Sequence, residues 1–309
     1  MTKRRDFLVG AAASTAVGMA GLARAQGQPA EKAPVIVFEK PFQKMPYAAM
    51  GEWLQEQGFN GIEATVRRGG HIKIEEAADK VPGMVADLAK SNQQAHIVAT
   101  HVGDASPENE KFLRILKDNG IKRYRMDYFS YDLNGDMLKQ AREYNAKAKD
   151  LAALNKELGI QGIYQLHSGA KLVGGMSWDL ALVLEGIDPA DLGIGFDLRH
   201  FRTDSGLSWR AAKQVCRPHV QALYVKDAKW VGEGSKKLRA CRLGTGFVDY
   251  PLFAASTKGL PPMPVSLHME WGRHNVYPEA ELQDALARVA IDKTTLDSWM
   301  SGEKEKKRP

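Results

Sequence analysis

Four short apolar runs in this chain each end in side chains that can do acid–base or metal chemistry. They span residues 164–167, 193–200, 224–227 and 268–271. Their last positions carry carboxylate, imidazole, amide and amine groups, namely Gln165, His167, Asp197, His200, Lys226 and Glu270. Because the C-terminal ends of parallel strands open on one face of a barrel, we expect these groups to surround one pocket.

The polar residues of these and one further run follow the two-residue period of a β-strand, whose side chains alternate between two faces. The sets that share a face are Glu63, Thr65 and Arg67; Gln165 and His167; Asp197 and Arg199; Tyr224 and Lys226; and His268 and Glu270. The alternate positions are mostly apolar, which suits the side that packs on helices. The pattern predicts a lined pocket and does not specify a reaction.

Two of these carboxylates could hold a divalent cation. Hard cations prefer oxygen ligands, and borderline ones also accept imidazole. The candidate ligands for Mn²⁺, Mg²⁺ or Zn²⁺ are Asp197, Glu270, Gln165 and His200, with His167 as an alternative imidazole. In the other interpretation the carboxylates pair with Arg199 and Lys226 in a metal-free polar network.

Polar and aromatic residues near other strand ends are candidates for sugar binding. They are Lys40, Glu63, Arg67, His71, His101, Arg199, His200 and Trp230. Amines, guanidinium groups and imidazoles can bind hydroxyl groups, and an indole ring can stack on a sugar. Each could instead be solvated or packed at the rim.

The elements that must position these groups alternate between strand and helix. The expected strands are 34–39, 61–66, 95–100, 123–128, 162–166, 194–198, 220–225 and 265–270. The expected helices are 47–57, 74–91, 108–119, 137–158, 177–184, 209–215, 250–256 and 279–290, with a long loop over 230–246. Eight such units predict a single (β/α)8 TIM barrel. An open doubly wound sheet would carry a glycine-rich phosphate loop after the first strand, and residues 39–43 lack glycine, so no nucleotide cofactor is expected.

The N-terminus resembles a twin-arginine export signal. Arg4 and Arg5 precede an Ala/Gly-rich apolar run, and residues 23–25 fit a small-x-small cleavage site. The sequence therefore predicts a signal peptide over 1–25, a linker over 26–33, the barrel over 34–291 and a charged, frayed tail over 292–309. We expect export through the Tat machinery to the periplasm, with no stable membrane span after processing.

Charge and cysteine content exclude two other classes. The formal charge of the 309 residues is +6, but seven Lys and Arg residues lie in the leader and the tail, and the remainder is close to neutral. We therefore expect no nucleic-acid partner. The two cysteines, Cys216 and Cys241, are too few for a disulfide framework and are expected to be free thiols.

The sequence resembles the xylose isomerase-like TIM-barrel family, also described as sugar phosphate isomerases and epimerases. The similar segments are 58–63, 197–200, 225–227, 243–249 and Glu270, while 38–43, 66–71 and 164–169 are similar to an exported branch of the family. The resemblance implies a carbohydrate substrate and one divalent metal. It also implies glutamate bases on the fifth and eighth strands, an aspartate ligand on the sixth and a histidine ligand on the seventh.

This chain departs from that family pattern at two positions. Gln165 stands where the first glutamate is expected, and Tyr224 stands where the histidine is expected. His167 and Lys226 are the available substitutes for the missing base. His200 matches a histidine that contacts substrate hydroxyl groups.

Three functions follow from these residues. In the first, an isomerase or epimerase uses Glu270 as the base α to a sugar carbonyl, with His167 as the acid and a metal or Lys226 beside the enediolate oxygen. In the second, the same proton abstraction from a 3-keto-glycoside ends in elimination, as in a lyase or hydratase. In the third, the protein binds sugars without catalysis. A DNA-repair endonuclease of this fold would need more His and carboxylate ligands.

Overall fold

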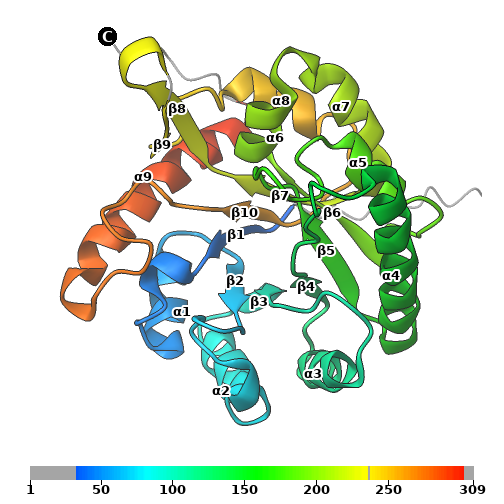
Figure 1. Cartoon of the computed structure of the whole chain (residues 1–309). Coiled ribbons are helices and arrows are strands. Elements are labelled where there is room, and N and C mark those ends of the chain that lie inside the picture. Colours follow the sequence, from blue (N-terminus) through cyan, green and yellow to red (C-terminus); the bar gives the residue numbers. More distant parts are fainter. Residues whose placement is uncertain (1–32, 236, 303–309) are drawn as a thin grey trace, which may run out of the picture. The chain divides into compact units, whose positions relative to one another are not determined.

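A computed structural model describes residues 33–235 and 237–302, which contain a closed barrel of parallel strands in the order β1-β10-β7-β6-β5-β4-β3-β2 (Figure 1). Every neighbouring pair in the barrel is parallel. The expected (β/α)8 TIM barrel is therefore confirmed. The proposed signal peptide, all but the last residue of the linker, and residues 303–309 lie outside the described residues.

The strands occupy the apolar runs of the sequence. The barrel strands are β1 (Val35–Phe38), β2 (Gly61–Thr65), β3 (Gln94–Ala99), β4 (Arg123–Arg125), β5 (Gln161–Gln165), β6 (Leu192–Asp197), β7 (Val220–Val225) and β10 (Val265–Leu267). Outside the barrel, β8 (Asp227–Val231) and β9 (Lys237–Cys241) form an antiparallel pair. The fourth and eighth barrel strands are three residues shorter than expected, ending at Arg125 and Leu267.

Helices follow most strands and surround the barrel (Figure 1). They are α1 (Tyr47–Glu56), α2 (Ala77–Ala89), α3 (Pro107–Asp118), α4 (Met137–Leu158), α5 (Trp178–Val183), α6 (Leu198–Ser205), α7 (Trp209–Cys216), α8 (Tyr250–Thr257) and α9 (Leu282–Met300). Short 3₁₀ turns precede α2 at Ile74–Glu76 and α9 at Glu279–Glu281. Within the described residues, no helix is long and apolar enough to cross a membrane.

Local sequence signals fix the helix ends. The Asp136 side chain accepts a hydrogen bond from the Lys139 amide at the start of α4, and Asp249 does the same for Leu252 at α8. Such caps satisfy amides that have no partner within the helix. Helix α4 ends at Gly159, whose φ of 67° lies in the left-handed region that glycine adopts at little cost.

Three expectations about the second half of the chain are wrong. The loop expected over 230–246 contains most of the β8–β9 hairpin, in which 227–231 pairs antiparallel with 237–241 across a glycine-containing turn. An additional helix, α6, begins directly after Asp197, so Arg199 lies on a helix and not on the sixth strand. The last helix runs to Met300, ten residues past the expected end, because Leu296 and Trp299 are buried and hold it to the core.

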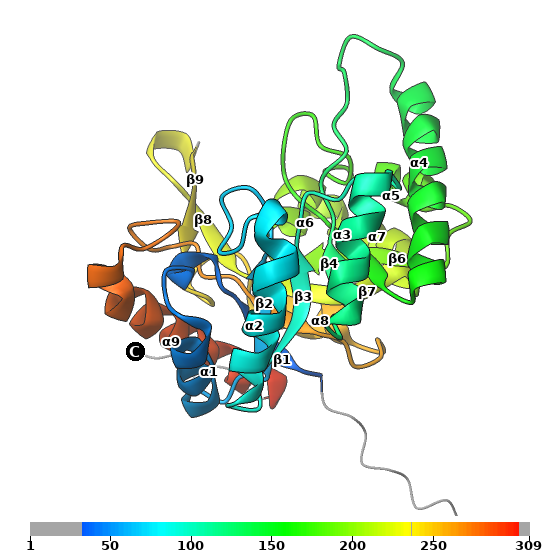
Figure 2. The same ribbon diagram turned by 90° about the horizontal axis from the view of Figure 1, so that it is seen from below.

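The carboxylate of Asp227 fastens the hairpin to the chain that follows it. Its two oxygens accept hydrogen bonds from the amides of Gly246 (2.7 Å), Val248 (2.9 Å) and Ala228 (2.7 Å). Gly246 approaches so closely that a Cβ there would lie 2.1 Å from the Ala228 carbonyl oxygen. Figure 2 shows the hairpin on the same side of the barrel as the loops that follow β2 and precede α4.

Side chains fill the barrel interior, as in other TIM barrels. An inner apolar cluster comprises Ile36, Ile97, Ile163, Ala222 and Tyr224. The larger apolar core lies between the strands and the surrounding helices, and Cys216 and Cys241 are free, buried thiols. The Tyr224 ring fits inside because Gly195 on the neighbouring strand has no side chain.

We predict that Gly195→Ala destabilises the protein by about 1–3 kcal/mol, because overpacking a filled core forces neighbours to shift. A Cβ at Gly195 would lie 2.2 Å from Tyr224 Cε2 and 2.9 Å from Ile163 Cγ2. The matched control is Gly83→Ala in the exposed surface of α2, where a Cβ meets nothing within 4 Å. There alanine should stabilise by about 0.4–1 kcal/mol. Urea unfolding of both variants measures the difference, and equal stabilities would contradict this account of the barrel interior.

Candidate functional site

The four side chains expected to converge do meet at the C-terminal end of the barrel. Gln165 on β5 donates its Nε2 to Asp197 Oδ2 at the end of β6, over 2.7 Å. The ammonium of Lys226, directly after β7, lies 3.1 Å from Asp197 Oδ2 and 2.8 Å from Glu270 Oε1. We call these four residues the rim cluster.

Asp197 owes its position to the junction of a strand with a helix. It ends β6 and caps α6, with Oδ1 accepting a hydrogen bond from the His200 amide over 3.1 Å. Burial by itself would raise the pKa of this carboxyl, but the Lys226 ammonium and, to a lesser extent, His200 hold it well below its usual range. Asp197 is therefore a permanent anion at the floor of the rim cluster.

Glu270 is the member of the rim cluster that solvent reaches, and Lys226 is buried beside it. Burial would lower the pKa of Lys226, but Asp197 and Glu270 raise it, so the amine stays charged. The Glu270 side chain is 35% exposed. Although burial raises the pKa of Glu270, the charge of Lys226 outweighs that effect and lowers it to about 2. Arg199 on α6 adds a second cation, with Nη1 lying 3.4 Å from Glu270 Oε2.

A second ion-pair group fills the barrel beneath the rim cluster. Glu63 on β2 is fully buried; its Oε1 accepts from Arg125 Nε over 2.6 Å. Its Oε2 lies 2.8 Å from both Ser266 Oγ and His268 Nε2. Arg125 Nη1 donates to Gln165 Oε1 over 2.6 Å and so joins the two groups.

Arg125 is therefore central to the site, and the sequence reasoning missed it. It ends β4, where the two-residue rule would place its side chain inside the barrel. Glu39 was also missed; it directly follows β1 and is fully buried. Charged residues at strand ends inside otherwise apolar runs were the signal in both cases.

The imidazoles of His167 and His200 lie against each other at a tilt of 33°, with ring centroids 3.8 Å apart. His167 Nδ1 lies 2.8 Å from the Ser168 carbonyl oxygen, which can only accept, so Nδ1 carries a proton. Burial, and then the charge of Lys226, lower the pKa of His167. His167 is thus a neutral imidazole whose Nε2 has a free electron pair at neutral pH.

His200 is held through Nδ1, which accepts a hydrogen bond from the Ser168 amide over 3.1 Å. Its ring proton is therefore on Nε2, which lies 4.0 Å from Asp197 Oδ2. Burial is the largest cause that lowers the pKa of His200 to about 2, with Asp197 opposing it. The ring is therefore neutral and almost fully enclosed.

Lys40, Arg67 and His101 lie near the charged groups of the mouth. Burial lowers the pKa of Lys40, and its charge also interacts with Arg67 and Glu270. The Arg67 guanidinium lies 5.8 Å from the centre of the Phe38 ring. Burial lowers the pKa of His101. The charge of Asp127 opposes this shift, and the charge of Arg67 adds to it.

His71 and Trp230 are placed differently. Glu39 Oε2 lies 3.2 Å from His71 Nδ1, and the imidazole stacks on Tyr47 with centroids 4.1 Å apart. Trp230 lies on β8 and is 49% exposed. Within the described residues, no contact joins Trp230 to the rim cluster. Glu63, the remaining sugar-binding candidate, is committed to its buried ion pair.

Comparison with known proteins shows the fold. No family model matches the sequence, and no curated protein matches it. Solved structures of xylose isomerase-like TIM barrel proteins do match, and the chain shares their fold. One is the probable 3-DHS dehydratase AsbF from Bacillus anthracis, with 15% identity, 85% of this chain and 98% of that chain covered, and a TM-score of 0.63.

Two further structures have similar scores. The 3-keto-D-glucoside 4-epimerase YcjR from E. coli has 13% identity, with 85% of this chain and 100% of that chain covered and a TM-score of 0.61. The IOLI protein with a bound zinc atom has 12% identity, with 88% of this chain and 99% of that chain covered and a TM-score of 0.68. These proteins therefore include an epimerase, a dehydratase and a metal-bound barrel.

The candidate ligands of this chain do not fit a divalent metal as they are arranged. Gln165 directs its amide nitrogen at Asp197, while its Oε1 accepts from Arg125 and from Tyr128 Oη. An amide nitrogen cannot coordinate a cation. Within residues 33–235 and 237–302, no three His, Cys, Asp or Glu side chains converge closely enough to hold a metal ion. The ion-paired arrangement of Asp197 and Glu270 with Lys226 and Arg199 is the one observed.

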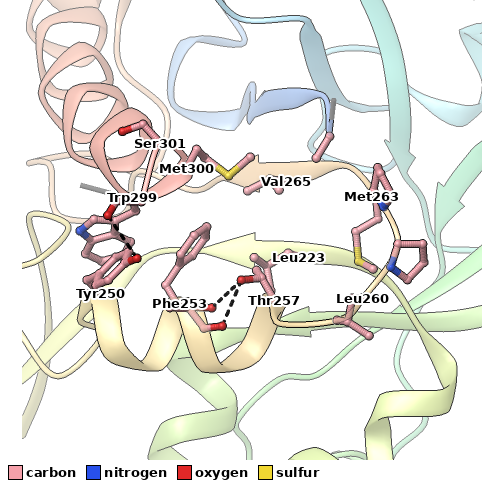
Figure 3. Close-up of a pocket in the computed structure, with 15 residues that line it drawn as sticks. Leu223, Tyr250, Phe253, Thr257, Leu260, Met263, Val265, Trp299, Met300 and Ser301 are labelled. Carbon is pink, nitrogen blue, oxygen red and sulfur yellow. Dashed lines mark hydrogen bonds between the residues drawn. The ribbon is translucent and has the colours of Figure 1, made fainter. Parts of the chain in front are cut away.

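An apolar cavity of about 430 Å³ lies near the opposite end of the barrel (Figure 3). It is bounded by α8, the end of α9 and the chain that enters β10, with Tyr250, Phe253, Met263 and Trp299 among its lining residues. Among the described residues that line it, none is charged. This surface does not suit a sugar, which requires several hydrogen-bonding groups.

We predict that Glu63→Gln costs about 3–5 kcal/mol of stability, because it leaves the buried Arg125 without a counter-charge. The matched control is Glu110→Gln, which breaks an exposed pair with Arg114 and should cost at most about 1 kcal/mol. Urea unfolding at neutral pH measures both.

The buried Glu63–Arg125 pair should also make the stability of the protein depend on pH. Burial by itself would raise the pKa of Glu63. The charge of Arg125, and then the contact with His268, outweigh burial and lower this pKa from an ordinary 4.5 to about 2. Its stabilising contribution is thus complete above pH 4.5 and is lost as the pH falls towards 2. The stability gap between the native chain and Glu63→Gln should narrow over that interval. A constant gap would contradict the assignment.

Proposed function

We propose that this protein is a sugar isomerase or epimerase-like enzyme that removes a proton α to a sugar carbonyl. The observation that carries the proposal is the pairing of a partly exposed carboxylate, Glu270, with the buried ammonium of Lys226 at the barrel mouth. A base beside a fixed cation suits the formation of an enediolate. The epimerase among the proteins of similar fold supports the same reaction class.

The reaction begins when the carbonyl oxygen of the substrate approaches Lys226. The ammonium then interacts with that oxygen as well and stabilises the Glu270 carboxylate less. Glu270 therefore becomes a stronger base. Glu270 takes the α proton, the C–H electrons form a carbon–carbon double bond, and the carbonyl electrons move onto the oxygen beside Lys226. Returning the proton to the neighbouring carbon completes an isomerisation.

His167 supplies the second proton transfer in this scheme. Because its Nδ1–H faces the Ser168 carbonyl, the free Nε2 accepts a proton from the adjacent substrate hydroxyl. The imidazole then donates that proton to the oxygen that was the carbonyl. The sequence reasoning assigned His167 the role of the acid; in its neutral form it acts as a shuttle that is first base and then acid.

Elimination from a 3-keto-glycoside is the second candidate. It is favoured by the replacement of one of the two expected glutamates by Gln165, because elimination needs one base and one proton donor. Glu270 removes the proton at C2, the electrons form a double bond to C1, and the C1–O bond breaks towards the departing aglycone. Glu270, which now carries that proton, donates it to the leaving oxygen, so the aglycone departs as an alcohol and the Glu270 carboxylate is regenerated.

We predict that the native protein incorporates deuterium from heavy water into a keto-sugar or 3-keto-glycoside substrate. Glu270→Gln should slow this exchange by about 10²–10⁴-fold, the usual contribution of a positioned base. Glu281→Gln, a glutamate paired with the exposed His274, is the matched control and should exchange at the native rate. Mass spectrometry or NMR of the recovered sugar measures the exchange.

The products separate the candidates. Exchange with a rearranged sugar supports the isomerase or epimerase, and exchange with release of aglycone supports the lyase. Binding of sugars without exchange into any of them would show a non-catalytic sugar-binding protein. Full exchange by Glu270→Gln would reject Glu270 as the base.

We also propose that the protein works after export to the periplasm, on the strength of Arg4 and Arg5 before an apolar run. Replacing both arginines by lysine should retain the protein in the cytoplasm, because the Tat machinery recognises the arginine pair. Lys3→Gln, which leaves the pair intact, is the control. Cell fractionation measures the distribution, and unchanged export of the double variant would contradict the proposal.

A further inference from the structure

We infer that the ammonium of Lys226 takes the place of a divalent metal, so that the chain carries its own permanent cation at the centre of the site. The role of this cation in catalysis rests on the proposed function, but its occupation of the position does not. Lys226 Nζ bridges Asp197 Oδ2 at 3.1 Å and Glu270 Oε1 at 2.8 Å. These are the carboxylates that a metal in this barrel would use.

Geometry makes the ammonium and a metal mutually exclusive. A divalent ion binds carboxylate oxygens at about 2.0–2.6 Å. An ion bridging the same two oxygens would overlap the position of Nζ. Lys226 is almost fully buried between its partners and has no alternative anion among its described contacts.

The hydrogen bonds of the neighbouring side chains suit the Lys226 ammonium as the cation of the site. Gln165 donates to Asp197 Oδ2, the oxygen that also faces Nζ, and so acts as a donor where a metal would need an acceptor. His200 meets the Ser168 amide through the lone pair of Nδ1. Neither side chain offers a free lone pair to the space between Asp197 and Glu270.

Charge balance gives a second, independent reason. Arg125, Lys226 and Arg199 face three carboxylates, those of Glu63, Asp197 and Glu270. The paired groups are therefore neutral overall without an added ion. A divalent metal would leave two uncompensated charges in a buried environment, where such charges are costly.

The arrangement leaves the ammonium able to contact a substrate. An ammonium has three N–H donors, and Asp197 and Glu270 use two of them. The third can donate to a carbonyl oxygen as negative charge develops on it. A metal would do the same as a Lewis acid, so the two cations are chemically equivalent at this step.

The test measures metal binding directly and needs no substrate. We expect the native protein, after treatment with a chelator, to show no stoichiometric binding of Mn²⁺ or Zn²⁺ by calorimetry. Lys226→Ala in a Gln165→Glu background should gain one site per chain, because it frees both carboxylates beside a third oxygen ligand, and adding Asp197→Asn should remove that site again. Lys293→Ala in the same background, which removes a buried lysine that pairs with Asp297, is the matched control and should gain none.

Two results would overturn the inference. One is a native protein that binds one Mn²⁺ or Zn²⁺ per chain and loses it together with Asp197→Asn. The other is a folded Lys226→Ala, Gln165→Glu variant, verified by circular dichroism, that gains no metal site. If that variant does not fold, the native titration decides alone. Failure of the proposed function would instead appear as absent deuterium exchange in a native protein whose metal titration is as expected.

Discussion

Everything at the mouth of this barrel depends on the rule that a charge taken out of water must have a partner. Glu63, Arg125, Asp197 and Lys226 are all buried, and each contacts an opposite charge or a strong hydrogen-bond partner. These residues lie on or directly after four different strands, so each charge has its partner only when the barrel is closed. Removal of one ion would leave its neighbour in a low-dielectric environment, which costs several kcal/mol. The site is therefore also part of what holds the strands in register.

The rule also explains why the charges are at one end. Below them, the barrel is filled by apolar groups, namely Ile36, Ile97, Ile163, Ala222 and the Tyr224 ring. Above them, solvent reaches Glu270. The charged layer thus separates an apolar interior from an open mouth, and the apolar floor strengthens electrostatic effects on a bound carbonyl.

The sequence predicted the parts of the fold that have a strong local signal. Apolar runs with a two-residue period located every barrel strand, and the strand ends correctly brought Gln165, Asp197, Lys226 and Glu270 together. The hairpin was missed because its strands contain several charged residues and lack a long apolar run. Arg125 was missed because a lone arginine in a polar-ended strand resembles a surface residue until Glu63, distant in sequence, supplies its partner.

The choice between ion pairs and a metal could not be made from the sequence. The same carboxylates suit both, and the decision lies in which atom of Gln165 faces Asp197 and where Lys226 extends. Both depend on long-range contacts, with Arg125 and Tyr128 fixing the amide and Glu270 fixing the amine. Composition and spacing carry no information about such orientations.

Lys226 and Asp227 are adjacent in the chain but serve two separate structures. Lys226 enters the ion-pair network, whereas Asp227 secures the backbone at Gly246 and Val248. The peptide between them is thereby held on both sides. Substitutions in the hairpin that keep Asp227 should accordingly leave the backbone of Lys226, and with it the position of the ammonium, unchanged.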